Sequence, residues 1–416
     1  MNRELAPEIS DLHQVNFVKP TCVNTKNSFY HIDNPSDESI RLELIFNAGS
    51  KFQSKKLQAS FTSDLLLSGT PSKNSKEINE SIDEEGGYIQ VESDRDTIML
   101  TVYCLAKNLE KIWDELEEAL LNVNFPKEEF ETLKAVKTQQ FKVNSEKVSS
   151  LARREFAKKI FTKDTPYDSG VEIDDYQNIT RQDIIDFYQE FIAKGLKGIF
   201  LVGNMSEEIK EKLDAFGTHF YGDKKVADTE YKSEVCQKMI DKEGAIQSAI
   251  RVGKTTVNRG EDDYVPLQIL NTILGGYFGS RLMANIREDK GYTYGIGSGI
   301  APLVDAAYFF ISTEVGSDVK HEALAEIKKE IEILQKEPIS ESELSLVKNY
   351  TIGQFLKGSD GPFSMMDRFK SLWFFDLDYD YYENYMSIVK NISTQKLHDI
   401  AKKYLEWETM SIIVVG

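Results

Sequence analysis

Apolar residues recur at every second position in two stretches of the first half of the chain, from Ile40 to Phe46 and from Ile98 to Cys104. A period of two places these residues on one face of a β-strand, so each stretch predicts a strand with one buried face. The stretch NLEKIWDELEEALLN, which begins at Asn108, instead repeats its apolar residues every three or four positions. That spacing predicts a helix with one apolar side.

The predicted strands and helices occur in runs and do not alternate regularly. Pro126 and Pro338 stand where helices should begin, because proline is tolerated in the first turn of a helix. Runs of strands followed by runs of helices are typical of the α+β class, in which an antiparallel sheet is covered by helices on one side. We therefore predict an α+β protein.

The same pattern occurs twice along the chain. NITRQDIIDFYQEFIAKGLKGIFLVG begins at residue 178 and NISTQKLHDIAKKYLEWETMSIIVVG at residue 391, and both predict a helix followed by an apolar strand. Upstream of these, FPKEEFETLKAVKTQQFK parallels EPISESELSLVKNYTIGQFLK. Two matches in the same order predict two homologous halves. The residues that match in register in the first pair are Asn178/Asn391, Ile179/Ile392, Gln182/Gln395, Asp186/Asp399, Val202/Val415 and Gly203/Gly416.

The repeat predicts the domain organisation. We expect a first domain at residues 1–220, a linker at 221–240 and a second domain at 241–416. The linker prediction rests on YGDKKVADTEYKSEVCQ, a polar and charged segment that begins at Tyr221 and has no sustained periodicity. Two similar domains joined in this way suggest a clamshell with a cavity between them.

The composition narrows the range of partners. The chain has 416 residues, of which 68 are acidic and 50 basic, for a net charge of −18. Nucleic acids and anionic membranes are bound through basic patches, so this balance argues against both. No apolar run approaches the roughly 18 residues of a membrane span. The first residues also lack the apolar core of a signal peptide, so we expect a cytoplasmic protein, or a periplasmic one if a signal has been removed.

The cysteines point to a reducing compartment. Cys22, Cys104 and Cys236 are widely spaced, and no CxxC pair exists. An odd number of isolated cysteines cannot form a complete disulfide framework, so we expect buried free thiols.

Three further features are weak candidates for chemistry. The stretch GIGSGI at residue 295 has the wrong spacing for a dinucleotide-binding loop and reads as a flexible strand. The aromatic stretch WFFDLDYDYYENY at residue 373 could contact peptides, although aromatic residues at helical spacing more often form core and rim. Isolated histidines without a zinc-binding spacing are more often structural or exposed. The five histidines are His13, His31, His219, His321 and His398.

Two segments carry stronger candidates. In LQASFTSDLLLSGT, Ser60, Ser63 and Asp64 stand at i, i+3 and i+4, so they share one face of an otherwise apolar helix. In SRLMANIREDKGYTYGIGSG, Arg287 and Tyr294 lie on either side of a predicted helix-to-strand turn and could converge on one carbonyl or carboxylate. On spacing alone, the favoured interpretation is a surface salt bridge for Arg287 and core packing for Tyr294.

With both segments, the chain resembles the pitrilysin/insulinase peptidases, or inverzincins, a family that includes mitochondrial processing peptidase. The resemblance extends over essentially all 416 residues and both halves. It implies two domains of the LuxS/processing-peptidase-like fold, arranged as a clamshell. IREDKGYTYG is similar to the family's second-domain element, whose arginine and tyrosine bind the substrate backbone and stabilise the reacting carbonyl. The resemblance assigns those substrate-binding roles to Arg287 and Tyr294.

The resemblance also suggests a role for the predicted helix that carries Ser60, Ser63 and Asp64, here named the serine-rich helix. The family binds zinc through His-x-x-Glu-His, followed by Gly-Thr, and through a glutamate on a later helix. Ser60 stands at the first histidine, Ser63 at the glutamate and Asp64 at the second histidine, while the third ligand falls on Gln140 or on Gln139. Serine and glutamine are poor zinc ligands, and Ser63 cannot act as a general base near neutral pH. The segment is therefore predicted to be a vacated zinc site, with no metal or catalytic residue in this chain.

The resemblance implies a division of labour between two chains. In several members one chain carries His-x-x-Glu-His, and the other keeps only the arginine and tyrosine. We therefore expect a non-catalytic subunit, inactive alone, of a heterodimeric zinc peptidase that acts on oligopeptides. It would supply Arg287 and Tyr294 to a homologous subunit that binds the zinc, although the isolated chain could form a homodimer. The alternative is a pseudopeptidase scaffold or peptide-binding protein without a role in proteolysis.

Overall fold

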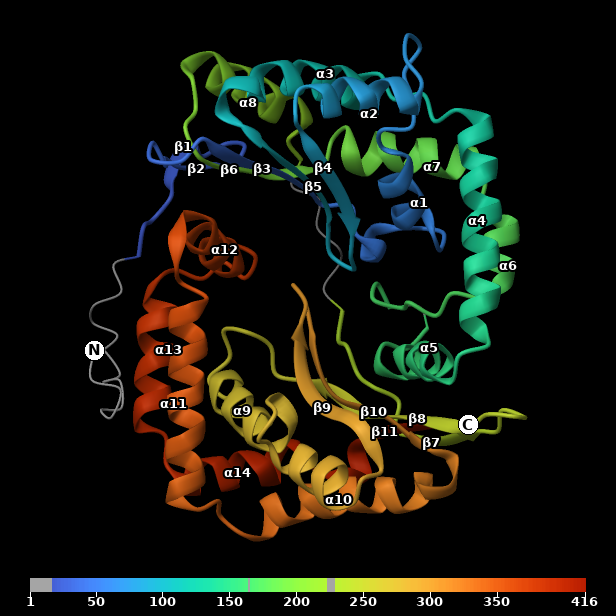
Figure 1. Ribbon diagram of the computed structural model, residues 1–416, viewed down its shortest axis with the longest axis vertical. Helices are drawn as coiled ribbons and strands as arrows, with labels where there is room; N and C mark the ends of the chain where they lie inside the picture. Colours follow the sequence, from blue (N-terminus) through green and yellow to red (C-terminus); the bar gives the residue numbers. More distant parts are fainter. Residues whose placement is uncertain (1–16, 164, 223–228) are drawn as a thin grey trace.

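The computed structural model describes residues 17–163, 165–222 and 229–416. Two β-sheets, one from each half of the chain, lie across the middle of the molecule from each other, and helices cover the outer face of each sheet (Figure 1). This arrangement confirms the α+β class and the two similar halves. Among the described residues, no helix has both the length and the apolar character needed to span a membrane.

The first sheet is built from the first half of the chain. Its edge strand β4 pairs with β5 in antiparallel register, and β5 pairs in the same way with the central strand β3. On the other side of β3 lies β6, which is parallel to β2. The order across the sheet is β1 (Thr21–Asn24), β2 (Phe29–Ile32), β6 (Leu196–Val202), β3 (Ser39–Phe46), β5 (Ile98–Leu105) and β4 (Tyr88–Ser93).

The second sheet repeats this topology. In each sheet the last strand of the half inserts between an earlier strand, to which it is parallel, and the central strand, to which it is antiparallel. Each sheet therefore contains one parallel pair, which the expectation of purely antiparallel sheets missed. The order is β7 (Gln237–Ile240), β11 (Ser411–Val415), β8 (Gln247–Thr256), β10 (Ala307–Gly316) and β9 (Thr293–Pro302), so that β7 lies inside the segment predicted as the linker.

Fourteen α-helices are described. Those of the first half are α1 (Gln58–Leu65), α2 (Ser75–Glu84), α3 (Leu109–Leu121), α4 (Lys127–Ser145), α5 (Val148–Ile160), α6 (Ile173–Asn178), α7 (Arg181–Phe187) and α8 (Glu207–Phe220). Those of the second half are α9 (Tyr264–Asn271), α10 (Lys320–Lys336), α11 (Glu341–Lys357), α12 (Gly361–Trp373), α13 (Asp380–Asn391) and α14 (Thr394–Tyr404). Pro126 is the N-cap of α4, whereas Pro338 lies ahead of the N-cap Ser340 of α11, so neither proline occupies the first helical turn.

The sequence repeat also appears in side-chain contacts. Helices α7 and α14, which precede the last strand of each half, contain the matched Gln and Asp positions. Gln182 donates from Nε2 to Asp186 (2.7 Å), and Gln395 donates in the same way to Asp399 (3.0 Å). Residues four apart face each other on a helix, so the same local pair stabilises the equivalent helix in both halves.

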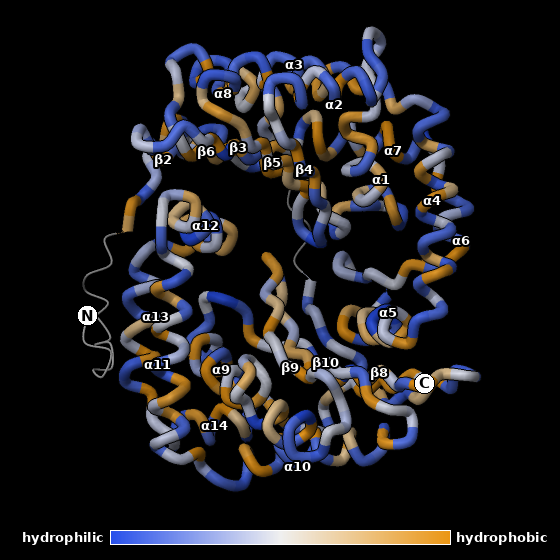
Figure 2. The backbone as a smooth tube through the Cα atoms, in the orientation of Figure 1, coloured by the Kyte–Doolittle hydropathy of each residue, from blue (hydrophilic) through white to orange (hydrophobic). Residues whose placement is uncertain are grey.

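The two halves exchange one helix each. Helix α5 of the first half packs on the second sheet, where Phe156 and Ile160 join Ile413 and Val415 in one apolar cluster. Helix α12 of the second half packs on the inner face of the first sheet, and Figure 1 shows both helices between the sheets. In Figure 2 hydrophobic segments line the sheets and the helix faces turned toward them. The prediction that helices cover each sheet on one side only is therefore incomplete.

Charged groups accompany α12 onto the first sheet. Arg41 and Glu43, which alternate with the apolar residues of β3, are both buried. Arg41 Nη2 lies 2.8 Å from Asp367 Oδ1, and Lys370 Nζ lies 2.5 Å from Glu43 Oε1. A buried charge is tolerated when it is paired, so α12 supplies the partners that these two strand residues require.

A second polar contact joins the halves at the turn between β4 and β5. The Tyr167 hydroxyl donates to Asp96 Oδ1 (2.5 Å), and the backbone N–H of Val304 donates to Asp96 Oδ2 (3.1 Å). Lys51 bridges the same carboxylate and Asp305, at 2.8 and 3.0 Å. The halves are thus connected both at α12 and at this turn.

Candidate functional site

Helix α1 carries the serine-rich triad. The Ser63 side chain is buried, and its hydroxyl donates to the backbone carbonyl of Ser60 (2.9 Å). Asp64 is exposed at the next position. Within this triad, Ser63 is therefore committed to its own helix, whereas Ser60 and Asp64 direct polar groups toward a neighbouring element.

That neighbour is Lys137 on α4. Its ammonium donates to the Ser60 hydroxyl (2.9 Å) and forms an ion pair with the Asp64 carboxylate. The same ammonium lies 5.5 Å from the centre of the Phe61 ring, which adds a favourable cation–π contact. Three residues of α1 thus hold one lysine side chain of α4.

These side chains do not fit a zinc ion. Structural and catalytic zinc sites in proteins use thiolate, imidazole and carboxylate ligands, whereas this group offers two hydroxyls and one carboxylate. The single carboxylate is already paired with an ammonium, and a second cation beside it would be repelled. Within the described residues, no three His, Cys, Asp or Glu side chains are grouped closely enough to hold a metal ion.

The glutamines proposed at the third ligand position do not take part in this contact. Gln139 and Gln140 are both exposed on α4, and Gln140 lines a pocket together with Lys137. Lys137 stands three residues before Gln140, which is about one helical turn. Its spacing from Gln140 was visible in the sequence, but no pattern there indicated that it reaches α1.

The arginine and tyrosine element lies in the other half, and it runs from the helix before β9 into the first residues of that strand. Arg287 belongs to a π-helix (Met283–Asp289) that ends in a tight turn before β9. The backbone N–H of Tyr292 donates to the carbonyl of Ile286 (3.0 Å), which closes this turn. Gly291 adopts φ +67°, a conformation that glycine reaches without steric cost. The turn brings the end of the helix back against the start of the strand.

Tyr294 sits in a β-bulge at the start of β9. Thr293 pairs with Val315 and Ile296 with Thr313, so Tyr294 and Gly295 together oppose the single residue Glu314. A bulge bends its strand and re-aims its side chains, and such bulges are common next to active sites. The Tyr294 side chain is 95% exposed, which leaves its hydroxyl available to another molecule.

Arg287 has an aromatic neighbour. Its guanidinium lies 4.8 Å from the centre of the Phe278 ring, and Phe278 is itself 64% exposed. The surface salt bridge that spacing alone allowed for Arg287 is not found among the described residues. The core packing allowed for Tyr294 is excluded by its exposure.

Two family profiles match the chain. The profile described as Insulinase (Peptidase family M16) matches residues 29–172, and the one described as Peptidase M16 inactive domain matches residues 178–350. The chain belongs to the M16 peptidase family. The first match includes the serine-rich helix, and the second includes the arginine and tyrosine element.

Relatives within the M16 family have two kinds of description. YmxG of Bacillus subtilis, described as an uncharacterized zinc protease, is 20% identical over 81% of this chain and 83% of its own length. A Helicobacter pylori protein described as a non-peptidase homolog, also YmxG, is 20% identical over 90% of this chain and 88% of its own. The crystal structure of a peptidase M16 inactive domain from Pseudomonas fluorescens superposes with a TM-score of 0.85 at 20% sequence identity. The superposition covers 96% of this chain and 98% of the other. An M16 homologue with a non-catalytic role fits these observations.

The remaining sequence candidates have structural explanations. His31 and His398 each place Nε2 within 2.9 Å of a backbone carbonyl, while His13 lies outside the described residues. Cys104 is buried, and burial raises the pKa of its thiol to about 12. Cys22 is exposed, so the expectation that all three thiols are buried is wrong. The stretch GIGSGI forms part of strand β9.

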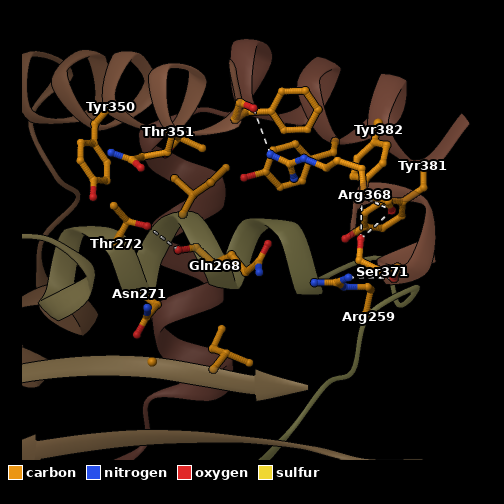
Figure 3. A pocket seen from close by; sticks show the side chains of 16 residues that line it. Arg259, Gln268, Asn271, Thr272, Tyr350, Thr351, Arg368, Ser371, Tyr381 and Tyr382 are labelled. Atoms are coloured by element: carbon orange, nitrogen blue, oxygen red, sulfur yellow. Dashed lines mark hydrogen bonds between the residues drawn. The ribbon is translucent and has the colours of Figure 1, made fainter. Parts of the chain in front are cut away.

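The aromatic stretch contributes to a pocket of about 410 Å³ within the second half (Figure 3). Tyr382 is buried, while Tyr381 and Tyr385 line the pocket with Arg259 and Arg368. Both arginines donate to backbone carbonyls, at 2.9 to 3.0 Å. The stretch therefore forms both core and pocket wall. The Arg259 guanidinium lies 5.1 Å from the centre of its Phe375 ring, and the Arg368 guanidinium lies 5.4 Å from that of Tyr382.

Proposed function

We propose that this chain is the non-catalytic subunit of a heterodimeric M16 zinc peptidase that acts on oligopeptides. Its partner would be a homologous chain that carries His-x-x-Glu-His and binds the zinc ion. Arg287 and Tyr294 would bind the substrate backbone and stabilise the reacting carbonyl at the partner's site. The observation that carries the proposal is the contrast between the two halves. In the first half Lys137 contacts Ser60 and Asp64, two of the expected zinc-site positions, and in the second half Tyr294 is exposed to solvent.

The first half supports a role without autonomous catalysis. A positioned general base contributes about 10²- to 10⁴-fold in rate, and the buried Ser63 cannot supply one. A bound metal would be needed to bring the pKa of water to about 7, and the donor set around Lys137 does not suit one. Both requirements for hydrolysis would have to come from a second chain.

The second half supports a role for Tyr294 toward another molecule. A bulge that turns a tyrosine out to 95% exposure gives no packing energy to the fold, whereas a free phenol can donate a hydrogen bond to a developing oxyanion. Arg287, oriented by the Phe278 ring, adds a positive charge on the neighbouring turn. Together they match the needs of a carbonyl that gains negative charge during cleavage.

The experiment is peptide turnover by the assembled complex with Tyr294→Phe. Loss of one oxyanion donor should lower kcat by about 10²- to 10³-fold and leave the amount of complex unchanged. Tyr88→Phe is the matched control, because Tyr88 is also an exposed tyrosine (60%) at the start of an edge strand, β4. Equal turnover by both variants would contradict the proposed role of Tyr294.

Arg287→Ala provides an independent test of the same element. Its loss should raise KM if the guanidinium contacts the substrate in the ground state, and it should also lower kcat if that contact strengthens in the transition state. Assembly with full activity in both variants would instead support the alternative of a scaffold or peptide-binding pseudopeptidase.

A further inference from the structure

A second pocket of about 410 Å³ lies in the first half, and its walls come from α4, α5, α6 and the turn between β4 and β5. Its charged lining residues are all cationic: Arg95 from the turn, Lys137 from α4, and Arg153 and Arg154 from α5. None of the described residues that line it is an aspartate or a glutamate. In a chain of net charge −18, such a concentration of positive charge is unexpected for a merely solvated surface.

The arginines of this pocket lack anionic partners. Arg95 donates to the Ser169 hydroxyl (3.2 Å) and Arg154 to the Ser145 hydroxyl (3.0 Å), and within the described residues none of Arg95, Arg153 and Arg154 pairs with a carboxylate. Two guanidinium nitrogens, Arg95 Nη1 and Arg154 Nε, are buried without a hydrogen-bond partner. A buried donor left unpaired is costly, so these nitrogens indicate a missing acceptor.

The guanidinium groups are held in fixed positions. Arg154 stacks on the Phe141 ring, 4.9 Å from its centre, and Arg95 lies 4.9 Å from the centre of the Phe161 ring. Arg251 of β8 lies near Arg153, because burial and then the charge of Arg153 lower the pKa of the Arg251 guanidinium. Planar guanidinium groups fixed in this way suit the planar, two-oxygen geometry of a carboxylate.

We propose that this pocket binds a carboxylate of a peptide, either its C-terminal carboxylate or the side chain of an aspartate or glutamate. The pocket volume exceeds that of a small inorganic anion, and Gln140 and Asn144 on the wall can bond backbone amides. Lys137 joins the pocket to the serine-rich helix, because it lines the pocket and pairs with Asp64. The vacated zinc site thus borders an anchoring site for an acidic group of the substrate.

The anchoring site rests on the proposed function and adds to it the chemical class of substrate that the subunit would hold. It concerns a property of the chain on its own, so it is tested without the partner. A negative result for peptide binding would contradict the anchoring site and would not affect the role of Tyr294. A negative result for turnover would contradict the role of Tyr294 and would not affect the anchoring site.

The experiment measures fluorescence anisotropy of a labelled peptide added to the full chain. Three forms of one otherwise uncharged sequence are compared: with a free C-terminal carboxylate, with a C-terminal amide, and with the amide plus one internal aspartate. At least one carboxylate form should bind about tenfold or more tightly than the neutral amide, and the difference should shrink at high salt. Which form gains affinity identifies the source of the carboxylate.

Two variants assign the effect to the pocket. Arg153 is exposed, so Arg153→Gln should keep the fold, and it should weaken carboxylate binding about tenfold. Lys142→Gln is the matched control, because Lys142 is an exposed cation of α4 that does not line the pocket. Gln140→Glu places a carboxylate on the pocket wall and should block binding.

Equal affinity for all three peptides would overturn the proposal. So would an equal loss of affinity in Arg153→Gln and Lys142→Gln, because that result assigns the binding to net charge and not to the pocket. Unchanged binding by Gln140→Glu would place the carboxylate elsewhere on the chain.

Discussion

Replacing Lys137 tests whether this side chain holds α1 against α4. Lys137→Met keeps most of the aliphatic stem and removes the ammonium, which breaks the ion pair with Asp64 and the hydrogen bond to Ser60. The two charged side chains are 20% and 37% exposed, so the ion pair is partly screened and contributes about 0.5 to 1 kcal/mol. The hydrogen bond adds about 1 kcal/mol. We expect the free energy of unfolding to fall by about 1.5 to 2 kcal/mol.

Urea denaturation measures this change, with Lys142→Met as the control. Lys142 is an exposed lysine of the same helix, and its replacement should change the free energy of unfolding by less than about 0.5 kcal/mol. A double-mutant cycle of Lys137→Met with Asp64→Asn should give a coupling of about 0.5 to 1 kcal/mol that decreases at high salt. A coupling of zero, or a Lys137→Met effect equal to that of the control, would refute the contact.

Two further predictions concern charged groups elsewhere. Lys370→Met should lower the free energy of unfolding by about 3 kcal/mol, because it leaves the buried Glu43 without its closest partner. Lys396→Met breaks a more exposed ion pair, with Asp263, and should lower the free energy of unfolding by less than about 1 kcal/mol. Thermal unfolding of both variants measures the difference, and equal shifts would contradict the role given to α12. Hydrogen bonds from Lys403 and Lys396 lower the pKa of Asp263 from 3.8 to about 2, so its stabilising contribution is complete above pH 4 and is lost as the pH falls toward 2. The stability difference between the native chain and Asp263→Asn should therefore narrow from pH 6 to pH 3, and a constant difference would contradict this.

The repeated pattern in the sequence predicted the fold class well for a physical reason. Apolar residues that recur every two positions predict strands, and those that recur every three to four positions predict helices. These spacings, and the helical position shared by Gln182 and Gln395, depend only on local geometry within each half. The exchange of α5 and α12 could not be predicted in this way. Arg41 and Glu43 read as the exposed face of a strand, and their partners Asp367 and Lys370 lie 326 and 327 residues further along the chain.

The same limit applies to the candidate site. Spacing on one helix identified Ser60, Ser63 and Asp64 as a group, because residues at i, i+3 and i+4 share a face. The residue of α4 that reaches them depends on how the two helices pack. The resemblance to the family's third zinc ligand pointed to Gln140, whereas in the structure Lys137 makes the contact. The bulge that exposes Tyr294 likewise depends on its pairing with β10, which no local pattern in β9 indicates.

Native mass spectrometry tests the central claim most directly. The chain is measured alone and after mixing with a homologous chain from the same organism that carries His-x-x-Glu-His. The account predicts that the chain alone carries no zinc and that the mixture gives a complex with one copy of each chain and one zinc ion. A zinc ion retained by this chain alone, or a mixture in which the two chains remain separate, would contradict it.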